Sequence, residues 1–504
     1  MRIPVANRFI LFGLVVLALV ALAAVAWLSK PVTVSAGQQP APLHTAAVSV
    51  GARACPSPGT PGSHNTGVAV IAAAARPGPG QATISMLSAT GGSASSPLVR
   101  LSQPGVLSLS SVPAAPAGSV PSSGGKDANS PVGQPGGVMI QATGSMAQGL
   151  AAEQTAAGSV TASCGSPGTD FWFAVPGQQS ASSIKLYLMN VDDQASDVDV
   201  DVVTDTGPLQ GGTDTGITVP PHGLVVQSLA GLVHGSRAIG LHVRTSVGRV
   251  VAAVSESSQA GQTGEWLPAA QSPADRLVIP AMPSSGGGRQ LYVADPGGGD
   301  AAVKLSVVTA GGTYEPTGAG AIDIPAGSAS RIELPSLAGV SGAAVLSSNV
   351  PVVAAVVVPG GPAGAPGVLT AAAPAIQEQG VVADAGQSGD TTTLVLSATG
   401  SAARVRLTTG ASGLTSSASS AATGSARVVT IPAKHTVIVK VTRPPGAGSG
   451  FAIVLTPLPG SGPVYAGRVL AKTSGTVLAV MPVASALTSV ALPAVRDSLM
   501  TVAP

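Results

Sequence analysis

The residues best placed to do chemistry are three carboxylates in the stretch NVDDQASDVDVDVV. Asp197, Asp199 and Asp201 alternate with valines, so on a strand their side chains share one face. Carboxylate oxygens grouped in this way can bind Ca²⁺. However, the stretch lacks the glycine and the closing glutamate of an EF-hand loop, and two later repeats carry Lys304 and Arg404 in this region. A solvated outer face is the favoured interpretation, the three aspartates remain the one Ca²⁺ candidate, and no other metal site is indicated.

Serine and lysine residues give partial matches to the motifs of serine hydrolases. Ser182–Lys185 and Ser123–Lys126 have the S-x-x-K spacing, and KTSG at 472–475 resembles K-T-G. The chemistry needs the serine at the start of a helix, whereas the first pair runs into a predicted strand and the second lies in a segment rich in glycine and proline. The six histidines are scattered and form no ligand cluster. We therefore predict no catalytic residues, no cofactor and no enzymatic activity.

The two cysteines lie in similar surroundings, Cys55 in ACPSPG and Cys164 in SCGSPG. In an exported protein, an isolated pair of this kind predicts one disulfide. It would close a loop of about 109 residues, for which chain-entropy models give roughly 4–5 kcal/mol of stabilisation. The alternative is a redox-active pair, which would normally have the short C-x-x-C spacing.

Three of the few aromatic residues follow Cys164 directly, as Phe171, Trp172 and Phe173 in TDFWFAVPG. Because such side chains bury large areas, we expect them to pack at a junction between two β domains built otherwise from small residues. The alternative is an exposed aromatic platform for a glycan or a peptide.

The N-terminus has the composition of a membrane anchor. Arg2 and Arg8 precede an uncharged apolar run, residues 9–28, which Lys30 follows. Twenty helical residues at about 1.5 Å each span a bilayer core, whereas the apolar region of a cleaved signal is only about 7–15 residues long. The charge balance predicts a cytoplasmic N-terminus, with the bulk of the chain outside the cell membrane. Cleavage after the small residues Val34–Ala36 is the alternative.

The composition of the rest favours an all-β fold. Charged residues make up 9% of the chain and aromatic residues 2%, while 45% are apolar, mainly Val, Ala and Leu. Such residues favour strands, and the 65 glycines and 43 prolines favour the turns between them. With 24 basic against 22 acidic residues, the chain has no charge excess that would indicate a nucleic-acid partner.

Internal repeats support this fold class. The strand-like run IKLYLMN is echoed by RQLYVAD and TTLVLSA, and the turn run ITVPPHG by IDIPAGS and VTIPAKH. Tyr187 recurs as Tyr292, and Pro220 as Pro325 and Pro432, a period of about 105 residues. This period is typical of an immunoglobulin-like β-sandwich domain. A propeller built from half-repeats of about 50 residues is the competing architecture.

These features predict tandem immunoglobulin-like β-sandwich domains after a single N-terminal transmembrane helix. The expected parts are a cytoplasmic N-terminus (1–8), the transmembrane helix (9–28), a linker (29–45), a disulfide-closed β domain (46–165) with a disordered insertion (113–137), and three sandwich repeats (166–275, 276–375 and 376–504).

The anchor, ACPSPG, SCGSPGTDFWFAVPG, LYLMNVDDQASDVDVDV and the closing VLAVMPVASALTSVALPAVRDSL together resemble an uncharacterised actinobacterial family of membrane-anchored exported proteins. The resemblance covers nearly the whole chain after the anchor and implies no activity or catalytic residues. Genes of the family tend to lie near genes for envelope glycan synthesis, which implies a place in the cell envelope. The expected function is a non-enzymatic binding or scaffolding module whose partner is an envelope protein or glycan. An envelope hydrolase and a cleaved, secreted adhesin are the alternatives.

Overall fold

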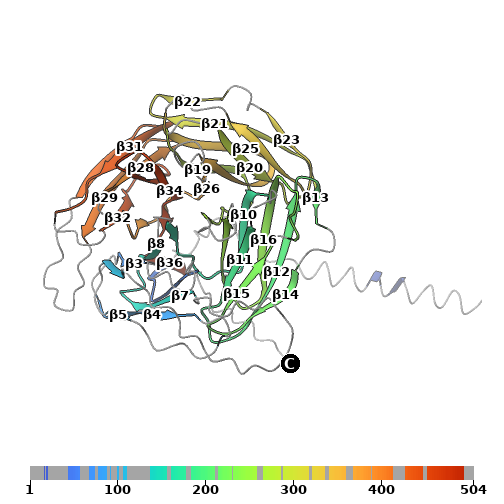
Figure 1. Cartoon of the computed structure of the whole chain (residues 1–504), viewed down its shortest axis with the longest axis horizontal. Helices are drawn as coiled ribbons and strands as arrows, with labels where there is room; N and C mark the ends of the chain where they lie inside the picture. Colours follow the sequence, from blue (N-terminus) through green and yellow to red (C-terminus); the bar gives the residue numbers. More distant parts are fainter. Residues whose placement is uncertain are drawn as a thin grey trace, which may run out of the picture. The chain divides into compact units, whose positions relative to one another are not determined.

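The structure is a computed structural model, and it shows an all-β protein (Figure 1). The chain divides into two compact units, one made of residues 1–46 and 491–504 and the other of residues 47–490. The residues described are 16–17, 19–20, 44–56, 67–73, 78–87, 91, 99–101, 106–109, 137–155, 161–177, 183–209, 214–229, 231–257, 265–284, 288–316, 321–334, 340–358, 367–386, 389–411, 426–445 and 451–492.

Residues 16–17 and 19–20 are helical, and the rest of the expected membrane span 9–28 lies outside the described residues. No helix in the described part of the chain is long and apolar enough to cross a membrane. The predicted insertion 113–137 also lies outside the described residues, apart from Gly137.

Alternation of apolar and polar residues explains why the strands form. In β12 (Ser196–Thr204), Val198, Val200 and Val202 are buried and the aspartates between them are half-buried. In β21 (Ala301–Thr309), buried Val303 and Leu305 alternate with more accessible residues in the same way. Since side chains of a strand point alternately to its two faces, each strand can bury a face of small aliphatic residues.

Four successive groups of strands, which we call modules 1 to 4, make up residues 50–485. Module 1 comprises β2 (Val50–Cys55), β3 (Gly67–Ala72), β4 (Gly80–Met86), β5 (Val99–Leu101), β6 (Val106–Leu109), β7 (Val138–Gly144), β8 (Leu150–Thr155) and β9 (Thr161–Ser163). Module 2 comprises β10 (Asp170–Pro176), β11 (Ser183–Met189), β12, β13 (Gly207–Pro208), β14 (Asp214–Val219), β15 (Leu224–Ser228), β16 (Ala238–Val247), β17 (Val251–Ser257) and β18 (Glu265–Leu267).

Module 3 comprises β19 (Ala274–Met282), β20 (Arg289–Ala294), β21, β22 (Gly312–Tyr314), β23 (Ile322–Ile324), β24 (Ala329–Leu334), β25 (Gly342–Val358) and β26 (Val368–Ala371). Module 4 comprises β27 (Gly380–Val382), β28 (Asp390–Ala398), β29 (Ala403–Ala411), β30 (Ala426–Ile431), β31 (His435–Val441), β32 (Phe451–Pro457), β33 (Tyr465–Lys472), β34 (Val477–Pro482) and β35 (Ala484–Ser485). Outside the modules, β1 (His44–Ala47) pairs with β36 (Ser489–Leu492).

Each module consists of two antiparallel sheets, and the strand order is the same in all four. Sheet a holds the module's first strand, as in β2-β7-β4-β5 and β10-β16-β12-β13. Sheet b holds its second strand, as in β6-β3-β8-β9 and β15-β11-β17-β18. In module 3 the long strand β25 belongs to both sheets, because its first half pairs with β19 and β21 and its second half with β20 and β26. The first β domain therefore has the same strand order as the three repeats seen in the sequence.

The strand pairing differs from that of an immunoglobulin constant domain, whose sheets are ABED and CFG. Here the first strand of the module pairs with the sixth, as β10 does with β16, and so belongs to the sheet that also holds the third strand, β12. The seventh strand, β17, pairs with the second strand, β11, in the other sheet. The two sheets of each module share one apolar core. The core of module 1, for example, combines Ile84 and Ile140 of sheet a with Val70 and Leu150 of sheet b.

Modules also pack against one another through the faces that point away from their own cores. We write 1a for sheet a of module 1, and so on for the other sheets. Sheet 1a packs on sheet 2b, 2a on 3b, 3a on 4b, and 4a on 1b. Each sheet thus has an apolar neighbour on both faces, and the order of contacts within residues 47–490 closes on itself. The sequence left two architectures open, and the structure has a feature of each: paired sheets around one core, and eight sheets in a closed sequence of contacts.

Candidate binding site

In every module the chain that leaves the last strand of sheet b crosses to sheet a and bonds to the module's first strand. In module 1, Ala54 and Gly165 exchange two backbone hydrogen bonds of 3.0 Å. In module 2 the Ala270 N–H donates to the Trp172 carbonyl at 2.8 Å, and in module 3 the Ala373 N–H donates to the Val278 carbonyl at 2.9 Å. In module 4 the crossing stretch is β35, which pairs with β27. We call these stretches the closing segments: residues 162–166, 266–271, 372–374 and 481–485.

The four closing segments surround a cavity of about 360 Å³. Two of them are bonded directly, since the Gln271 N–H donates to the Ala372 carbonyl at 2.8 Å. Pockets of about 300–1,000 Å³ that are mostly apolar and carry a few polar groups are the usual form of a small-molecule site. A cavity to which all four modules contribute the equivalent segment is therefore the candidate binding site.

The wall of the cavity is mainly apolar. Pro268, Pro374 and Pro482 come from three different closing segments, and Phe171 and Met481 add larger side chains. The polar side chains of the wall are a few serines, Gln271, Trp266 and Arg53. Arg53 is the one ionisable side chain among the described residues that line the cavity, since Cys164 is in a disulfide.

Arg53 lies on β2, next to the residue that bonds the closing segment of module 1. Its guanidinium donates to the carbonyl of Leu150 at 2.7 Å and to that of Ala52 at 2.9 Å. Burial lowers the pKa of Arg53 to about 10, because desolvation disfavours the charged form. The side chain is still a cation at neutral pH. No carboxylate in the described part of the chain forms a salt bridge with it.

Trp266 also lines the cavity. The residue is 8% exposed and packs edge-on against Tyr187, with 5.0 Å between the ring centres. Its indole Nε1 is fully covered and has no hydrogen-bond partner among the described residues, as is also true of Trp172. Trp266 therefore offers the cavity ring surface rather than a donor.

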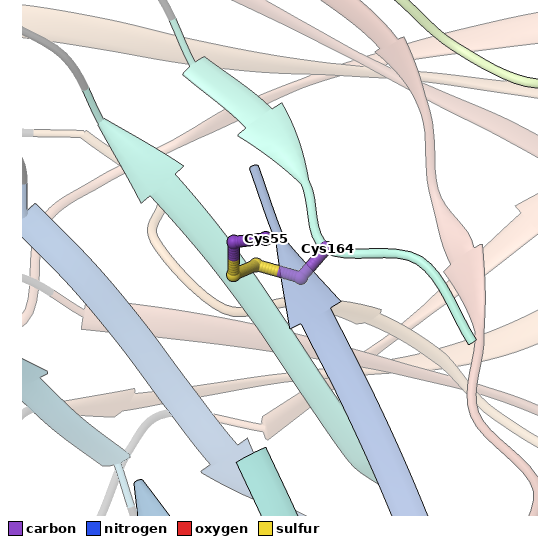
Figure 2. Close-up of a disulfide and its surroundings, with 2 residues drawn as sticks. All are labelled: Cys55 and Cys164. Atoms are coloured by element: carbon purple, nitrogen blue, oxygen red, sulfur yellow. A yellow bond between two sulfur atoms is a disulfide. The ribbon is translucent and has the colours of Figure 1, made fainter. Parts of the chain in front are cut away.

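The predicted disulfide is confirmed, and it holds the wall of the cavity. Cys55 ends β2, Cys164 follows β9, and their Cα atoms are 4.5 Å apart (Figure 2). Cys164 lines the cavity, and its closing segment is tied to β2 both by the disulfide and by the neighbouring Ala54–Gly165 bridge. In modules 2 to 4 the equivalent link is made by backbone hydrogen bonds alone.

The aromatic residues predicted at a junction lie in three environments. Phe173 is buried in the core of module 2, and Phe171 lines the cavity. Trp172 stacks on His242, with 3.7 Å between the ring centres, on the face of sheet 2a that points towards module 3. The surface between modules 1 and 2, where the sequence placed this trio, is formed instead by smaller side chains such as Met139 and Val251, because sheet 1a packs on sheet 2b rather than on the sheet of β10.

The three aspartates do share one face of β12, but each has its own partner. Thr218 donates to Asp197 at 2.9 Å, the backbone N–H of Gly216 donates to Asp199 at 3.0 Å, and Asp201 is 3.3 Å from Nε of Arg244. No group of three or more potential metal ligands occurs in the described part of the chain. The Ca²⁺ candidate therefore has no support.

The remaining sequence motifs stay apart from the cavity. Lys185 lies on β11, Lys472 pairs with Asp390 at 2.8 Å, and residues 123–126 lie outside the described residues. The shortest histidine–carboxylate distance among the described residues is 2.6 Å, between His242 Nε2 and Asp170. Neither residue lines the cavity.

Sequence reasoning missed the cavity and Arg53. A signal was present, because three of the modules end in a short run of apolar residues and proline: WLPAA at 266–270, TAAAPA at 370–375 and MPVASA at 481–486. What the sequence could not show is that these runs, about 100 residues apart, meet at one place.

Among solved structures, the chain has a distant similarity to an α-L-rhamnosidase from Streptomyces avermitilis complexed with L-rhamnose. The identity is 11% and the TM-score 0.10, with 86% of this chain and 55% of that chain covered, so the likeness carries no argument. No curated protein matches the chain. The model of a family of unknown function, DUF5719, matches residues 122–442, from the last part of module 1 into module 4. The chain belongs to this uncharacterised family.

Proposed function

We propose that the protein is a membrane-anchored, extracytoplasmic binding module that holds a small molecule in the cavity between its four closing segments. The observation that carries the proposal is that each module contributes its equivalent segment to one mainly apolar cavity. The other surfaces of the sheets are largely buried in module cores or between modules, whereas this concave site is open to a ligand.

The location outside the cytosol is supported by the disulfide and by the N-terminal sequence. Structural disulfides persist in oxidising compartments, and Cys55–Cys164 is one. The apolar run 9–28, flanked by Arg2, Arg8 and Lys30, is long enough for a single-pass anchor with its N-terminus in the cytoplasm.

A binding role rather than a catalytic one is supported by the chemistry of the cavity wall. Hydrolysis would require a nucleophile or a water activated by a neighbouring base. Ser163, Ser166 and Ser485 line the cavity, but no histidine, aspartate or glutamate stands with them among the described lining residues. We further interpret each module as an immunoglobulin-like sandwich whose two outer strands, such as β10 and β17, have exchanged sheets.

Photo-crosslinking on the full chain in lipid nanodiscs tests the binding role. The probe is an uncharged dodecanol carrying a diazirine, and labelled peptides are identified by mass spectrometry. Ala269 is exposed and lines the cavity, so Ala269→Trp should fill it without disturbing a module core. The control is Ala402→Trp, at an exposed turn outside the cavity wall.

We expect labelling of the closing segments in the wild type and in Ala402→Trp, and at least a tenfold loss in Ala269→Trp. Labelling restricted to the N-terminal residues 9–28, or labelling of the closing segments that Ala269→Trp does not change, would contradict the proposal.

A further inference from the structure

The cavity contains an unbalanced positive charge. Arg53 is the one charged side chain among the described lining residues, and no described carboxylate forms a salt bridge with it. The guanidinium is half-buried, and an anionic partner stabilises a cation that is partly removed from water. The two backbone carbonyls that Arg53 contacts carry only partial charge. The guanidinium also has five N–H donors, of which these two bonds use two.

The donors that face the cavity belong to Arg53, and the described wall has no ionised acceptor to receive them. Trp266 also lines the cavity, but its indole Nε1 is fully covered. Carboxylates and phosphates accept several hydrogen bonds at once, and arginine binds both.

The rest of the wall would suit an apolar body. Phe171, Met481 and the prolines of three closing segments offer carbon surface, and several alanines leave room beside them. Burial of CH₂ groups on such a surface favours binding.

We propose that the ligand of the cavity is an anionic amphiphile, with one oxyanion headgroup bound by Arg53 and an apolar body packed on the closing segments. This inference rests on the proposed binding function and specifies its ligand class. The headgroup is a carboxylate or a phosphate, which share the chemistry that the guanidinium recognises.

Three diazirine probes with the same dodecyl body test it, carrying an alcohol, a carboxylate or a phosphate headgroup. The full chain in zwitterionic nanodiscs is labelled with each, and labelling of peptides from the closing segments is titrated. The variants are Arg53→Gln, which removes the charge, and Arg53→Lys, which keeps it. Arg404→Gln, on the exposed side of β29, is the matched control.

We expect at least one anionic probe to bind the wild type tenfold or more tightly than the alcohol. Arg53→Gln should remove this preference and leave alcohol labelling unchanged, Arg53→Lys should retain part of it, and Arg404→Gln all of it. Whichever anionic probe binds more tightly identifies the headgroup.

Two failures can be told apart. If the three probes label the closing segments equally, and Arg53→Gln changes none of them, the binding role stands and the anionic ligand is wrong. If no probe labels the closing segments, the proposed function itself is wrong. Loss of the Cys55–Cys164 disulfide would show that Arg53→Gln fails to fold. In that case the decision rests on the preference for anionic probes in the wild type and in Arg53→Lys. Equal labelling by all three probes in both proteins rejects the inference.

Discussion

At the scale of single residues, three charged side chains lie where the chain is fastened or where it can bind. Arg53 lies at the cavity, and Arg468 joins the first and last modules. Glu378 fixes the chain after module 4, since its carboxylate accepts hydrogen bonds from the backbone and hydroxyl groups of Thr488 and Ser489. Charged residues make up only 9% of the chain, and each of these three side chains has an identifiable role: Arg53 lies at the cavity, while Arg468 and Glu378 hold parts of the chain together.

Glu378 predicts a pH-dependent release of this C-terminal stretch. Burial raises the pKa of Glu378, but the four hydrogen bonds outweigh it, so the folded-state pKa lies below the usual value. A lowered carboxyl pKa stabilises the fold above the unfolded value near 4.5, and this stabilisation is lost as the pH falls through the folded pKa. The protection factor of a peptide covering 486–492, measured against its intrinsic exchange rate at each pH, should therefore fall in acid.

Glu378→Gln should lower the same protection factor at neutral pH and remove its dependence on acid. Glu333→Gln, at a more exposed carboxylate, serves as the control and should change neither. An acid-dependent protection factor that persists in Glu378→Gln would show that another group controls the release.

Residue types predicted the disulfide but not the cation. Two cysteines have one possible pairing, so Cys55–Cys164 followed from the composition and from the expectation that the chain is exported. Arg53 belongs to no motif, and its importance comes from a cavity wall that residues as far away as Ser485 help to form. Sequence patterns do not record such contacts.

At the scale of elements, the turn after β14, β23 and β30 shows how the repeats preserve backbone geometry while residues change. The fourth residue of each turn donates its N–H to the first, at 3.0, 3.1 and 3.2 Å for Gly223, Ser328 and His435. The third residue has a positive φ in all three: 49° at His222, 65° at Gly327 and 60° at Lys434. This is the position of a type II turn that favours glycine.

Gly327→Ala should therefore lower the free energy of unfolding by about 1 kcal/mol or more, because alanine is strained at this φ. The new Cβ would also lie 3.1 Å from Pro208 Cγ. Lys434→Ala, at the equivalent turn, exchanges one non-glycine residue for another and should be nearly neutral. Urea denaturation of the two variants makes the comparison, and equal destabilisation would contradict the turn assignment.

The repeated strands and turns of modules 2 to 4 were predictable because their sequences still resemble one another. Module 1 was predicted as a β domain but not as a fourth repeat, because its strands, such as β5 (Val99–Leu101), are short and a long Pro- and Gly-rich stretch separates its fifth strand, β6, from its sixth, β7. The closing segments escaped notice for a different reason: their partners are the first strands of their modules, about 100 residues earlier.

At the scale of the whole molecule, the contact between modules 4 and 1 closes the sequence of packed sheets. Arg468 on β33 lies 2.9 Å from Glu153 on β8, and both are buried. Arg468 also donates to the Asp384 carbonyl, and the Ala383 N–H donates to Glu153 at 3.1 Å. Burial raises the pKa of Glu153, although Arg468 and these backbone groups oppose the shift. A pair 315 residues apart in the sequence could not be predicted from either residue alone.

Arg468→Met should destabilise the fold by about 3–5 kcal/mol at neutral pH, because it leaves the Glu153 carboxylate buried without its cation. The double variant Glu153→Gln with Arg468→Met should recover part of the loss. Arg331→Met, which breaks the exposed pair with Glu333, should cost less than about 1 kcal/mol. Urea midpoints measure all three, and equal effects of Arg468→Met and Arg331→Met would mean that the buried pair does not fasten the two modules.

The central claim is that four segments far apart in the sequence form one ligand site, and hydrogen exchange of the full chain in nanodiscs tests it most directly. On addition of dodecanoate or dodecyl phosphate, we predict slower exchange in peptides from all four closing segments, 162–166, 266–271, 372–374 and 481–485, with a single saturation curve for each ligand. Protection of only one segment, or protection elsewhere with these four unchanged, would contradict the account.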